Sequence, residues 1–311
     1  MRKENTMKLI TLGCHSACPR DRARTTSQLL EFRGHLFLID CGEGTQMALR
    51  LSSAKFARIK HVFISHLHGD HFYGLPGLIS TFQLQGREAE LHIYAPQGAK
   101  QAIELMLEVS GGYKSFPVIF HELTSKKSEL IFEDERLTVR TLPLDHRIYA
   151  NGFLFQEKPR ERRLNVEAVH TLGIERCYFQ NIKDGKDVIL ENGERIANER
   201  LSFPPPPSQS YAFCSDTAYL PSLIPLIQGV QVLYHEATFL EDNLALAERT
   251  KHSTALQAAQ IAKEAGAKTL ILGHYSSRYR EKSLFQEEAQ KVFAHTLLSE
   301  DGKEFVFADE D

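Results

Sequence analysis

The chain has 311 residues, of which 42% are hydrophobic and 25% charged, and its formal net charge at pH 7 is −3. These proportions are ordinary for a globular protein in water, and the length suits one large domain or two average ones. A charge this close to zero excludes a general attraction to polyanions, so any nucleic-acid site must be a local basic patch.

The predicted elements alternate between short apolar runs, which indicate strands, and amphipathic runs, which indicate helices. In chain order the sequence predicts strands at 7–13, 26–32 and 35–44, a helix at 45–54, a strand at 60–64, a helix at 74–85, a strand at 90–98, a helix at 99–111, strands at 137–146, 210–217 and 231–239, a helix at 253–266 with Ser or Thr as N-cap, a strand at 268–277 and a helix at 282–295. This order predicts a mixed α/β protein. A dinucleotide-binding fold is disfavoured, because no G-x-G-x-x-G follows the first strand and the opening is strand after strand.

Cysteine usage and hydropathy bear on location. The five cysteines, at positions 14, 18, 41, 177 and 214, are an odd and scattered set, which argues against a disulfide framework and for a reducing compartment. No apolar run approaches the roughly 18 residues needed to cross a bilayer, and the N-terminus lacks the apolar core of a signal peptide. We therefore expect a cytoplasmic protein without a membrane segment.

Residues 150–209 differ in character from the rest of the chain. This segment is polar, carries Asp-Gly and Asn-Gly turn signals, and ends in four prolines. We interpret it as a protruding arm, with a hairpin at 187–196, inserted into a single domain that spans 1–311. The alternative is a disordered linker between two domains. It is less favoured because candidate ligands lie on both sides of the segment.

A dense cluster of metal-type ligands follows the strand at 60–64. His66, His68, Asp70 and His71 form the pattern H-x-H-x-D-H, and imidazole and carboxylate groups are ligands of zinc, iron and manganese in hydrolytic sites. Four ligands in six residues do not complete a site for two metals. Three further candidates stand at distant strand ends: His146, Asp216 and His274. A carboxylate can bridge two cations, and Asp216 suits that role.

Other histidines and cysteines have simpler interpretations. A lone histidine at a strand end is more often structural or solvated than a ligand, which applies to His61, His92, His121 and His170. Positions 14 and 18 lack a second cysteine pair with which to form a metal site, so both are interpreted as ordinary thiols.

The ligand pattern resembles the metallo-β-lactamase superfamily. Within it, "SHLHGDHFYGLPGLIS", "DCGEGTQ", "HEATF" and "GHYSSRY" look like ribonuclease Z, the endonuclease that removes the 3′ trailer from precursor tRNA, over about residues 7–280. The resemblance implies an α/β fold of the αββα four-layer sandwich type, with metals at the edge of the two sheets. It also implies a precursor tRNA substrate, cleaved to a tRNA 3′-hydroxyl and a trailer 5′-phosphate, and a homodimer.

The resemblance also assigns the ligands. It places His66, His68 and His146 on one zinc ion and Asp70, His71 and His274 on the other, with Asp216 bridging them. Two Zn²⁺ per subunit are implied, with Mn²⁺ or Fe²⁺ as other metals that suit these donors.

Beyond the ligands, the resemblance implies three catalytic residues. Asp70 would orient or deprotonate the attacking water, and Glu236 and His252 would act near the leaving group. The plainer alternatives are a buried structural acid for Glu236 and a surface histidine at a helix start for His252.

RNA binding is the remaining implication. Arg20, Arg22, Arg24 and Arg278 are the candidate phosphate contacts, and the alternative is a solvated basic surface. The arm departs from the family pattern, because it lacks a Gly-Pro-rich turn and carries nine basic and nine acidic residues. Two other classes stay open: a hydrolase of small esters on the same fold, such as a phosphodiesterase or an arylsulfatase-like enzyme, and a metal-free RNA-binding scaffold.

Overall fold

The structure is a computed structural model that describes residues 6–18, 20, 23–111 and 115–308. The chain divides into two compact units. The larger unit comprises Met1–Gln156 and Gln209–Ala308, and the smaller one comprises Glu157–Ser208. Among the described residues, no helix has both the length and the apolar character needed to cross a membrane.

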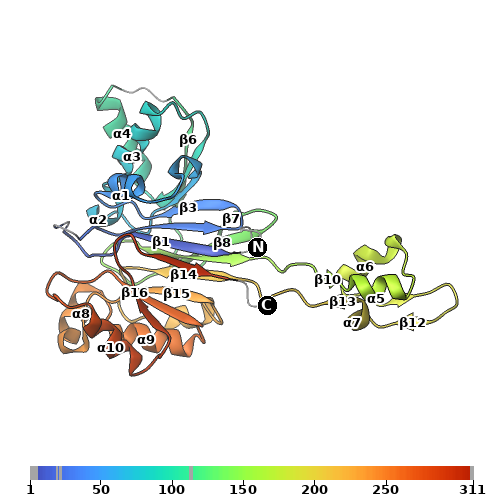
Figure 1. Cartoon of the computed structure of the whole chain (residues 1–311). Coiled ribbons are helices and arrows are strands. Elements are labelled where there is room, and N and C mark those ends of the chain that lie inside the picture. The colour runs from blue at the N-terminus through green and yellow to red at the C-terminus, as the bar shows by residue number, and fades with distance from the viewer. Residues whose placement is uncertain (1–5, 19, 21–22, 112–114, 309–311) are drawn as a thin grey trace. The chain divides into compact units, whose positions relative to one another are not determined.

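The larger unit is built on two seven-stranded sheets (Figure 1). The strands of the first sheet are Met7–Gly13 (β1), Ser27–Phe32 (β2), His35–Ile39 (β3), His61–Phe63 (β4), Leu91–Pro96 (β5), Val118–Leu123 (β6) and Glu304–Phe307 (β18). Their order is β18-β1-β2-β3-β4-β5-β6, antiparallel up to β3 and parallel from β3 to β6.

The second sheet has a similar mixed character. Its strands are Leu130–Glu133 (β7), Leu137–Pro143 (β8), Asn151–Glu157 (β9), Ser210–Cys214 (β14), Val232–Glu236 (β15), Thr269–Gly273 (β16) and Thr296–Leu298 (β17). The order is β17-β16-β15-β14-β9-β8-β7, with parallel pairing from β14 to β17.

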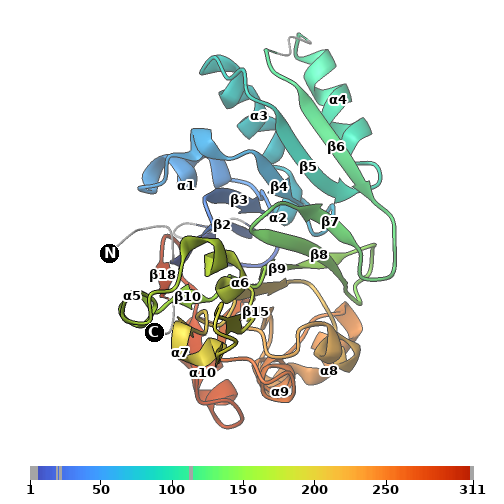
Figure 2. The ribbon, with the colours of Figure 1, turned by 90° about the vertical axis from the view of Figure 1, so that its right-hand side faces the viewer.

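Helices cover the outer face of each sheet. The first sheet carries Thr45–Leu51 (α1), Gly69–Phe72 (α2), Leu75–Leu84 (α3) and Ala99–Val109 (α4), and the second carries Leu244–Thr250 (α8), Ala255–Glu264 (α9) and Ser283–Gln290 (α10). Figure 2 shows the same elements after a quarter turn. Short 3-10 helices lie at Phe56–Arg58, Pro221–Leu226 and Glu241–Asn243. The predicted αββα four-layer sandwich is therefore confirmed.

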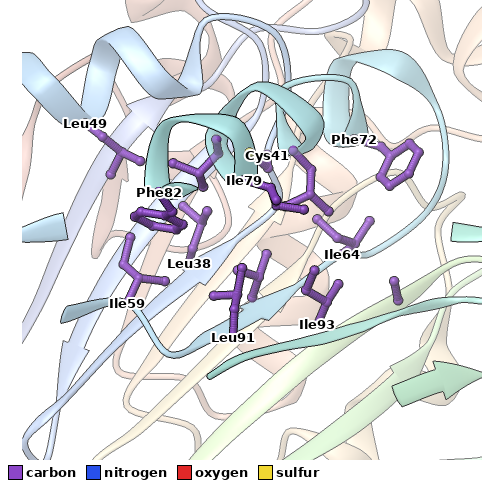
Figure 3. Close-up of a cluster of buried hydrophobic side chains, with 14 of the residues drawn as sticks. Leu38, Cys41, Leu49, Ile59, Ile64, Phe72, Ile79, Phe82, Leu91 and Ile93 are labelled. Atoms are coloured by element: carbon purple, nitrogen blue, oxygen red, sulfur yellow. The ribbon is translucent and has the colours of Figure 1, made fainter. Parts of the chain in front are cut away.

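Strand alternation explains the layers. On β3, Leu36 and Leu38 pack under the helices, while Phe37 and Ile39 point into the core between the sheets. Both faces are buried, which is why these strands read as continuous apolar runs. Figure 3 shows the outer core, where side chains of α3 meet those of the first sheet. The predicted N-cap at the start of α9 is confirmed, since Thr254 forms a capping box with Gln257.

The smaller unit has a core of its own. Its elements are Arg163–Leu164 (β10), Val166–Thr171 (α5), Arg176–Tyr178 (η3), Phe179–Lys183 (α6), Val188–Ile189 (β11), Arg195–Ile196 (β12), Asn198–Leu201 (α7) and Ser202–Phe203 (β13). Six buried side chains form the core: Val169, Ile174, Ile182, Val188, Ile196 and Leu201. The strands β11 and β12 pair antiparallel, as the predicted hairpin requires. This segment is folded, so the alternative prediction of a disordered linker is wrong.

The boundary expected at residue 150 is wrong by several residues. The strand β9 belongs to the second sheet and pairs with β14, from Gln156 opposite Ser210 to Phe153 opposite Phe213. Phe153 and Phe155 are fully buried in the core between the sheets. The residues of β9 were assigned to the polar segment because a charged stretch follows them directly. The inserted unit begins at 157 and ends at 208.

Candidate metal centre

The seven ligands predicted from the sequence lie just beyond the ends of strands from both sheets. The first sheet supplies four of them after β4, in a loop and in α2: His66, His68, Asp70 and His71. The second sheet supplies one each after β8, β14 and β16: His146, Asp216 and His274. Their ligand atoms converge into two groups. The structure thus brings together residues that are more than 200 positions apart in the sequence.

The first group is formed by three histidines and one oxygen of Asp216. His68 Nδ1 lies 3.0 Å from His66 Nε2 and 3.3 Å from His146 Nε2. Asp216 Oδ2 lies 3.6 Å from His66 Nε2 and 3.7 Å from His146 Nε2. A zinc–nitrogen bond of about 2.0–2.1 Å places tetrahedral ligands about 3.3–3.4 Å from one another. The measured separations bracket that value, so the donor set fits a four-coordinate zinc ion.

The second group uses the other oxygen of Asp216. The Nε2 atoms of His71 and His274 lie 3.4 Å apart, and Asp70 Oδ2 lies 3.6 and 3.5 Å from them. Asp216 Oδ1 lies 3.1 Å from both nitrogens. Each oxygen of Asp216 therefore faces one group, which is the geometry of a carboxylate that bridges two cations.

Hydrogen bonds to the far side of the rings fix the orientation of the histidines. His146 donates from Nδ1 to the carbonyl oxygen of Lys251 at 3.0 Å, and His274 donates from Nδ1 to Thr238 Oγ1 at 2.8 Å. A proton held on Nδ1 leaves the Nε2 lone pair free for a metal. Neither support was predicted from the sequence. Thr238 stands in the "HEATF" stretch and could have been considered, whereas a backbone carbonyl group leaves no signal in a sequence.

Asp40 supports two further ligands from the first sheet. His71 donates from Nδ1 to Asp40 Oδ2 at 2.6 Å. His66 Nδ1 lies 3.0 Å from Ser65 Oγ, and that hydroxyl donates to Asp40 at 2.8 Å. Asp40 was expected inside a strand over 35–44, but β3 ends at Ile39 and frees the carboxylate for this role. The "DCGEG" stretch was the available signal.

Glycine allows the loop after β3 to touch the helix that carries two ligands. A Cβ atom on Gly42 would stand 2.1 Å from the carbonyl oxygen of Asp70, and one on Gly74 would stand 2.1 Å from the carbonyl oxygen of Gly42. No side chain fits at either contact. These glycines belong to the "DCGEG" and "YGLPG" stretches, so the sequence pattern around the ligands reflects close backbone packing.

The buried charges favour a cation. Burial alone would lower the pKa of His71, but the carboxylates of Asp216, Asp70 and Asp40 outweigh it and raise that pKa well above its usual range. Burial would raise the pKa of Asp216, yet His274, His71 and His66 hold it well below the usual value. Three carboxylates concentrated in a buried site create a negative potential that bound metal ions would neutralise.

Glu236 and His252 form a buried acid–imidazole pair beside the ligands. His252 Nδ1 donates to Glu236 Oε1 at 2.8 Å, and the Glu236 carboxylate also accepts from the backbone N–H of Thr217 at 2.7 Å. Burial would lower the pKa of His252, but the Glu236 charge raises it to about 9. The His252 ring centroid lies 5.1 Å from that of His146. The pair thus places an imidazole with a raised pKa beside the candidate ligands.

Several site residues have a left-handed backbone. Outside glycine, five residues that build or support the site have φ between 56° and 62°: Ala17, Asp40, Asp216, Lys251 and His274. Ala17 belongs here because its N–H donates to Asp70 Oδ2 at 2.8 Å. Non-glycine residues rarely adopt this conformation unless the surrounding structure holds them in it.

A cavity of about 590 Å³ opens over the two groups. Its lining includes His68, Asp70, Asp216, His252 and His274. Arg278, one of the predicted phosphate contacts, lines it, and so does Arg147, which the sequence interpretation missed. Arg20 and Arg24 are not part of this lining, and Arg22 lies outside the described residues.

Comparison with known proteins gives matches over most of the chain. A family model described as the anti-Pycsar protein Apyc1 matches residues 7–158, which is less than half of the chain. That match ends before Asp216, Glu236, His252 and His274. Two curated bacterial proteins match almost throughout.

A "Ribonuclease Z" of Bacteroides fragilis is 47% identical over 294 residues, covering 94% of this chain and 97% of its own. A second, from Bacteroides thetaiotaomicron, is 45% identical and covers 94% of this chain and 92% of its own. Among solved structures, the short form of human tRNase Z (ELAC1) has a TM-score of 0.70 and 28% sequence identity. The match covers 98% of this chain and 100% of the human one.

Proposed function

This chain belongs to the ribonuclease Z family of the metallo-β-lactamase fold, and from that premise we propose that it removes the 3′ trailer from precursor tRNA as a metal-dependent endonuclease. The observation that carries the proposal is the complete set of seven converging ligands, with one carboxylate shared between two groups. A metal-free RNA-binding scaffold would have no use for such a set.

We propose two zinc ions as the cofactors, although Mn²⁺ and Fe²⁺ suit the same donors. His66, His68 and His146 would hold one ion, Asp70, His71 and His274 would hold the other, and Asp216 would contact both. When bound, such a pair lowers the pKa of water towards neutrality and stabilises negative charge on phosphoryl oxygens.

The chain's own groups have complementary roles in this scheme. Asp70, held by the N–H of Ala17, accepts a proton from the water that attacks phosphorus. His252 donates a proton to the 3′ oxygen that leaves, and Glu236 stabilises the charged imidazole from the opposite side. The products are a tRNA with a 3′-hydroxyl and a trailer with a 5′-phosphate.

RNA contacts outside the ligands are also proposals. Arg278 is the best placed of the four predicted arginines, since it lines the cavity over the ligands. Arg20, Arg22 and Arg24 would contact phosphates further from the cut. We further propose that the inserted unit is an arm that holds the body of the tRNA. Its equal numbers of basic and acidic residues require local clusters, such as the stretch 158–163, for that contact.

A hydrolase of small esters is the second candidate. The ligand groups alone are compatible with it, because a pair of metal ions that activates water can serve the hydrolysis of any phosphodiester. The inserted unit and the Glu236–His252 pair distinguish the two candidates, since a small ester needs no arm.

Cleavage of a precursor tRNA with a 3′ trailer tests the proposed function. We expect the metal-replete protein to cut it at the trailer junction, with kcat/KM at least about 10³-fold above that for bis(p-nitrophenyl) phosphate, because remote contacts contribute binding energy only with the RNA. Chelation should abolish both activities and added Zn²⁺ should restore them. Small-ester turnover without any RNA cutting would favour the second candidate.

We propose a cytoplasmic location and a homodimer. The location is supported by five cysteines that are all free thiols, with Cys18 and Cys177 exposed. The dimer is supported by large apolar side chains exposed on the adjacent helices α1, α3 and α4: Met47, Leu51, Leu84, Leu105, Met106 and Val109. Leu51 is 70% exposed and Leu84 is 90% exposed. Contact of so much apolar surface with water is unfavourable, and it is unusual for a protein that stays a monomer.

Introducing a charge on α1 tests the dimer. Light scattering after size exclusion should give twice the 35.3 kDa chain mass for the wild type, and one chain mass for Leu51→Glu, because a buried carboxylate opposes association. Val306→Glu is the matched control, since Val306 is 62% exposed on β18 and should keep the dimer. A wild-type protein that has the mass of one chain would contradict the proposal.

A further inference from the structure

A second cavity lies beside the metal centre and has no role in the mechanism described so far. It also has a volume of about 590 Å³, and we call it the side pocket. Its lining comes from three parts of the chain: residues 125–126, residues 143–151, and Leu220 with Ser222. Among its lining residues is His146, whose ring carries a ligand nitrogen on the metal side. Arg147 lines both cavities, so the side pocket begins where the metal cavity ends.

Two basic side chains, Lys126 and Arg147, and one carboxylate, that of Asp145, line the side pocket, so its lining has an excess of positive charge. Arg147 and Lys126 are exposed, and no described carboxylate pairs with either of them. The carboxylate of Asp145 pairs instead with Lys251, whose Nζ lies 2.8 Å from Asp145 Oδ2. Unpaired arginine and lysine side chains in a cavity wall favour a phosphate-bearing ligand.

The remaining walls suit a nucleobase. Leu144, Ile148 and Leu220 supply apolar surface, and Tyr149 supplies an aromatic ring. The tyrosine is held in place because its hydroxyl donates to the carbonyl oxygen of Ser125 at 2.9 Å and accepts from Asn151 at 2.8 Å. A pocket of this size with apolar walls and few polar groups accommodates a single nucleotide.

The position of the side pocket indicates which nucleotide it holds. The segment with Asp145 and His146 is fastened to Lys251 twice, by the ion pair and by the 3.0 Å bond from His146 Nδ1 to the Lys251 carbonyl. Arg147 is thereby placed next to His252, and both line the metal cavity. In the proposed function His252 protonates the leaving 3′ oxygen, so the nucleotide that carries this oxygen lies on the Arg147 side.

We propose that the side pocket binds the nucleotide immediately 5′ of the cut, the one that becomes the 3′ end of the mature tRNA. Arg147 contacts the phosphate between the two cavities, and Lys126 contacts the preceding phosphate. The inference rests on the proposed function and adds a binding site for the product side of the substrate. It also predicts that mature tRNA with a free 3′-hydroxyl inhibits the enzyme by filling the same pocket.

Alanine variants combined with abasic substrates test this. We expect Arg147→Ala and Lys126→Ala each to raise KM for precursor tRNA by about tenfold with a smaller change in kcat. Lys126→Ala should also raise Ki for mature tRNA by about tenfold, whereas Arg147→Ala should change that Ki less, because the phosphate that Arg147 contacts leaves with the trailer. In the wild type, an abasic nucleotide just 5′ of the cut should lower kcat/KM by about tenfold, the order of one lost base contact, and one just 3′ of it should matter less. Lys127→Ala, next to Lys126 but outside the lining, should match the wild type.

The outcomes separate the two proposals. A wild type that cuts no precursor tRNA overturns both. A wild type that cuts precursor tRNA, while both alanine variants behave like Lys127→Ala, overturns the side pocket alone. Equal losses from the two abasic positions would do the same, because they show that no pocket distinguishes the 5′ nucleotide.

Discussion

Replacing Asp216 by alanine is expected to lower kcat for precursor tRNA by more than about 10³-fold and to reduce the bound metal from two ions to fewer than one. The reason lies in its two oxygens, which face the first and second ligand groups separately. Its removal takes one donor from each group and leaves several histidines without their counter-charge. The loss of a single stabilising donor elsewhere in enzymes already costs about 10²–10³ in rate.

Metal analysis and kinetics on the same preparation check this prediction. Asp134→Ala is the matched control, because it also removes an aspartate bonded to a histidine, His35, at 2.7 Å. Neither residue lines the metal cavity, so metal content and rate should stay near the wild-type values. A protein with Asp216→Ala that retains two ions and full activity would refute the bridging role.

Deleting the inserted unit is expected to separate RNA cleavage from small-ester hydrolysis. Residues 158–207 can be replaced by an Asn-Gly turn, because Gln156 and Ser210 already face each other in the β9–β14 ladder. We expect kcat/KM for precursor tRNA to fall by about 10²-fold or more, since a second contact site on one ligand adds affinity of that order. Turnover of bis(p-nitrophenyl) phosphate should stay within about twofold, because every ligand lies outside the deletion.

Thermal unfolding and metal content of the shortened protein serve as controls for its folding. The deleted unit has its own apolar core, so its loss removes no side chain from the cores of the two sheets. Equal losses on RNA and small ester would mean that the inserted unit is not an arm for the substrate.

The convergence of the candidate ligands could be predicted because they combine a local pattern with chemistry that few other residues provide. His66, His68, Asp70 and His71 are adjacent in the sequence, and His146, Asp216 and His274 each follow an apolar strand. The supports around them were missed for a physical reason. The carbonyl oxygen of Lys251 exists in every residue, and Asp40 is only one acid among many until the fold places it 2.6 Å from His71.

The fold was predictable in its centre and less so at its margins. The strands around the core are apolar throughout, and they appear close to the expected positions. The strands β6, β7, β17 and β18 were not predicted; they are short or lie at sheet edges and are only partly buried. Their pairing depends on neighbours distant in sequence, so periodicity within three to six residues carries little information about them.

The left-handed residues around the candidate metal centre imply a conflict between the thermal stability of the fold and the function of the site. Ala17, Asp40, Asp216, Lys251 and His274 each adopt a conformation that costs a non-glycine residue on the order of 1 kcal/mol. Together they would subtract several kcal/mol from a fold whose net stability is typically about 5–15 kcal/mol. Selection for heat resistance would therefore favour glycine at these positions, and at Asp40, Asp216 and His274 the same change would remove the side chains that hold the site. Ala17 and Lys251 support the site through a backbone N–H and a backbone carbonyl oxygen, which glycine would keep, so these two positions are where glycine could raise heat tolerance without removing a ligand or Asp40.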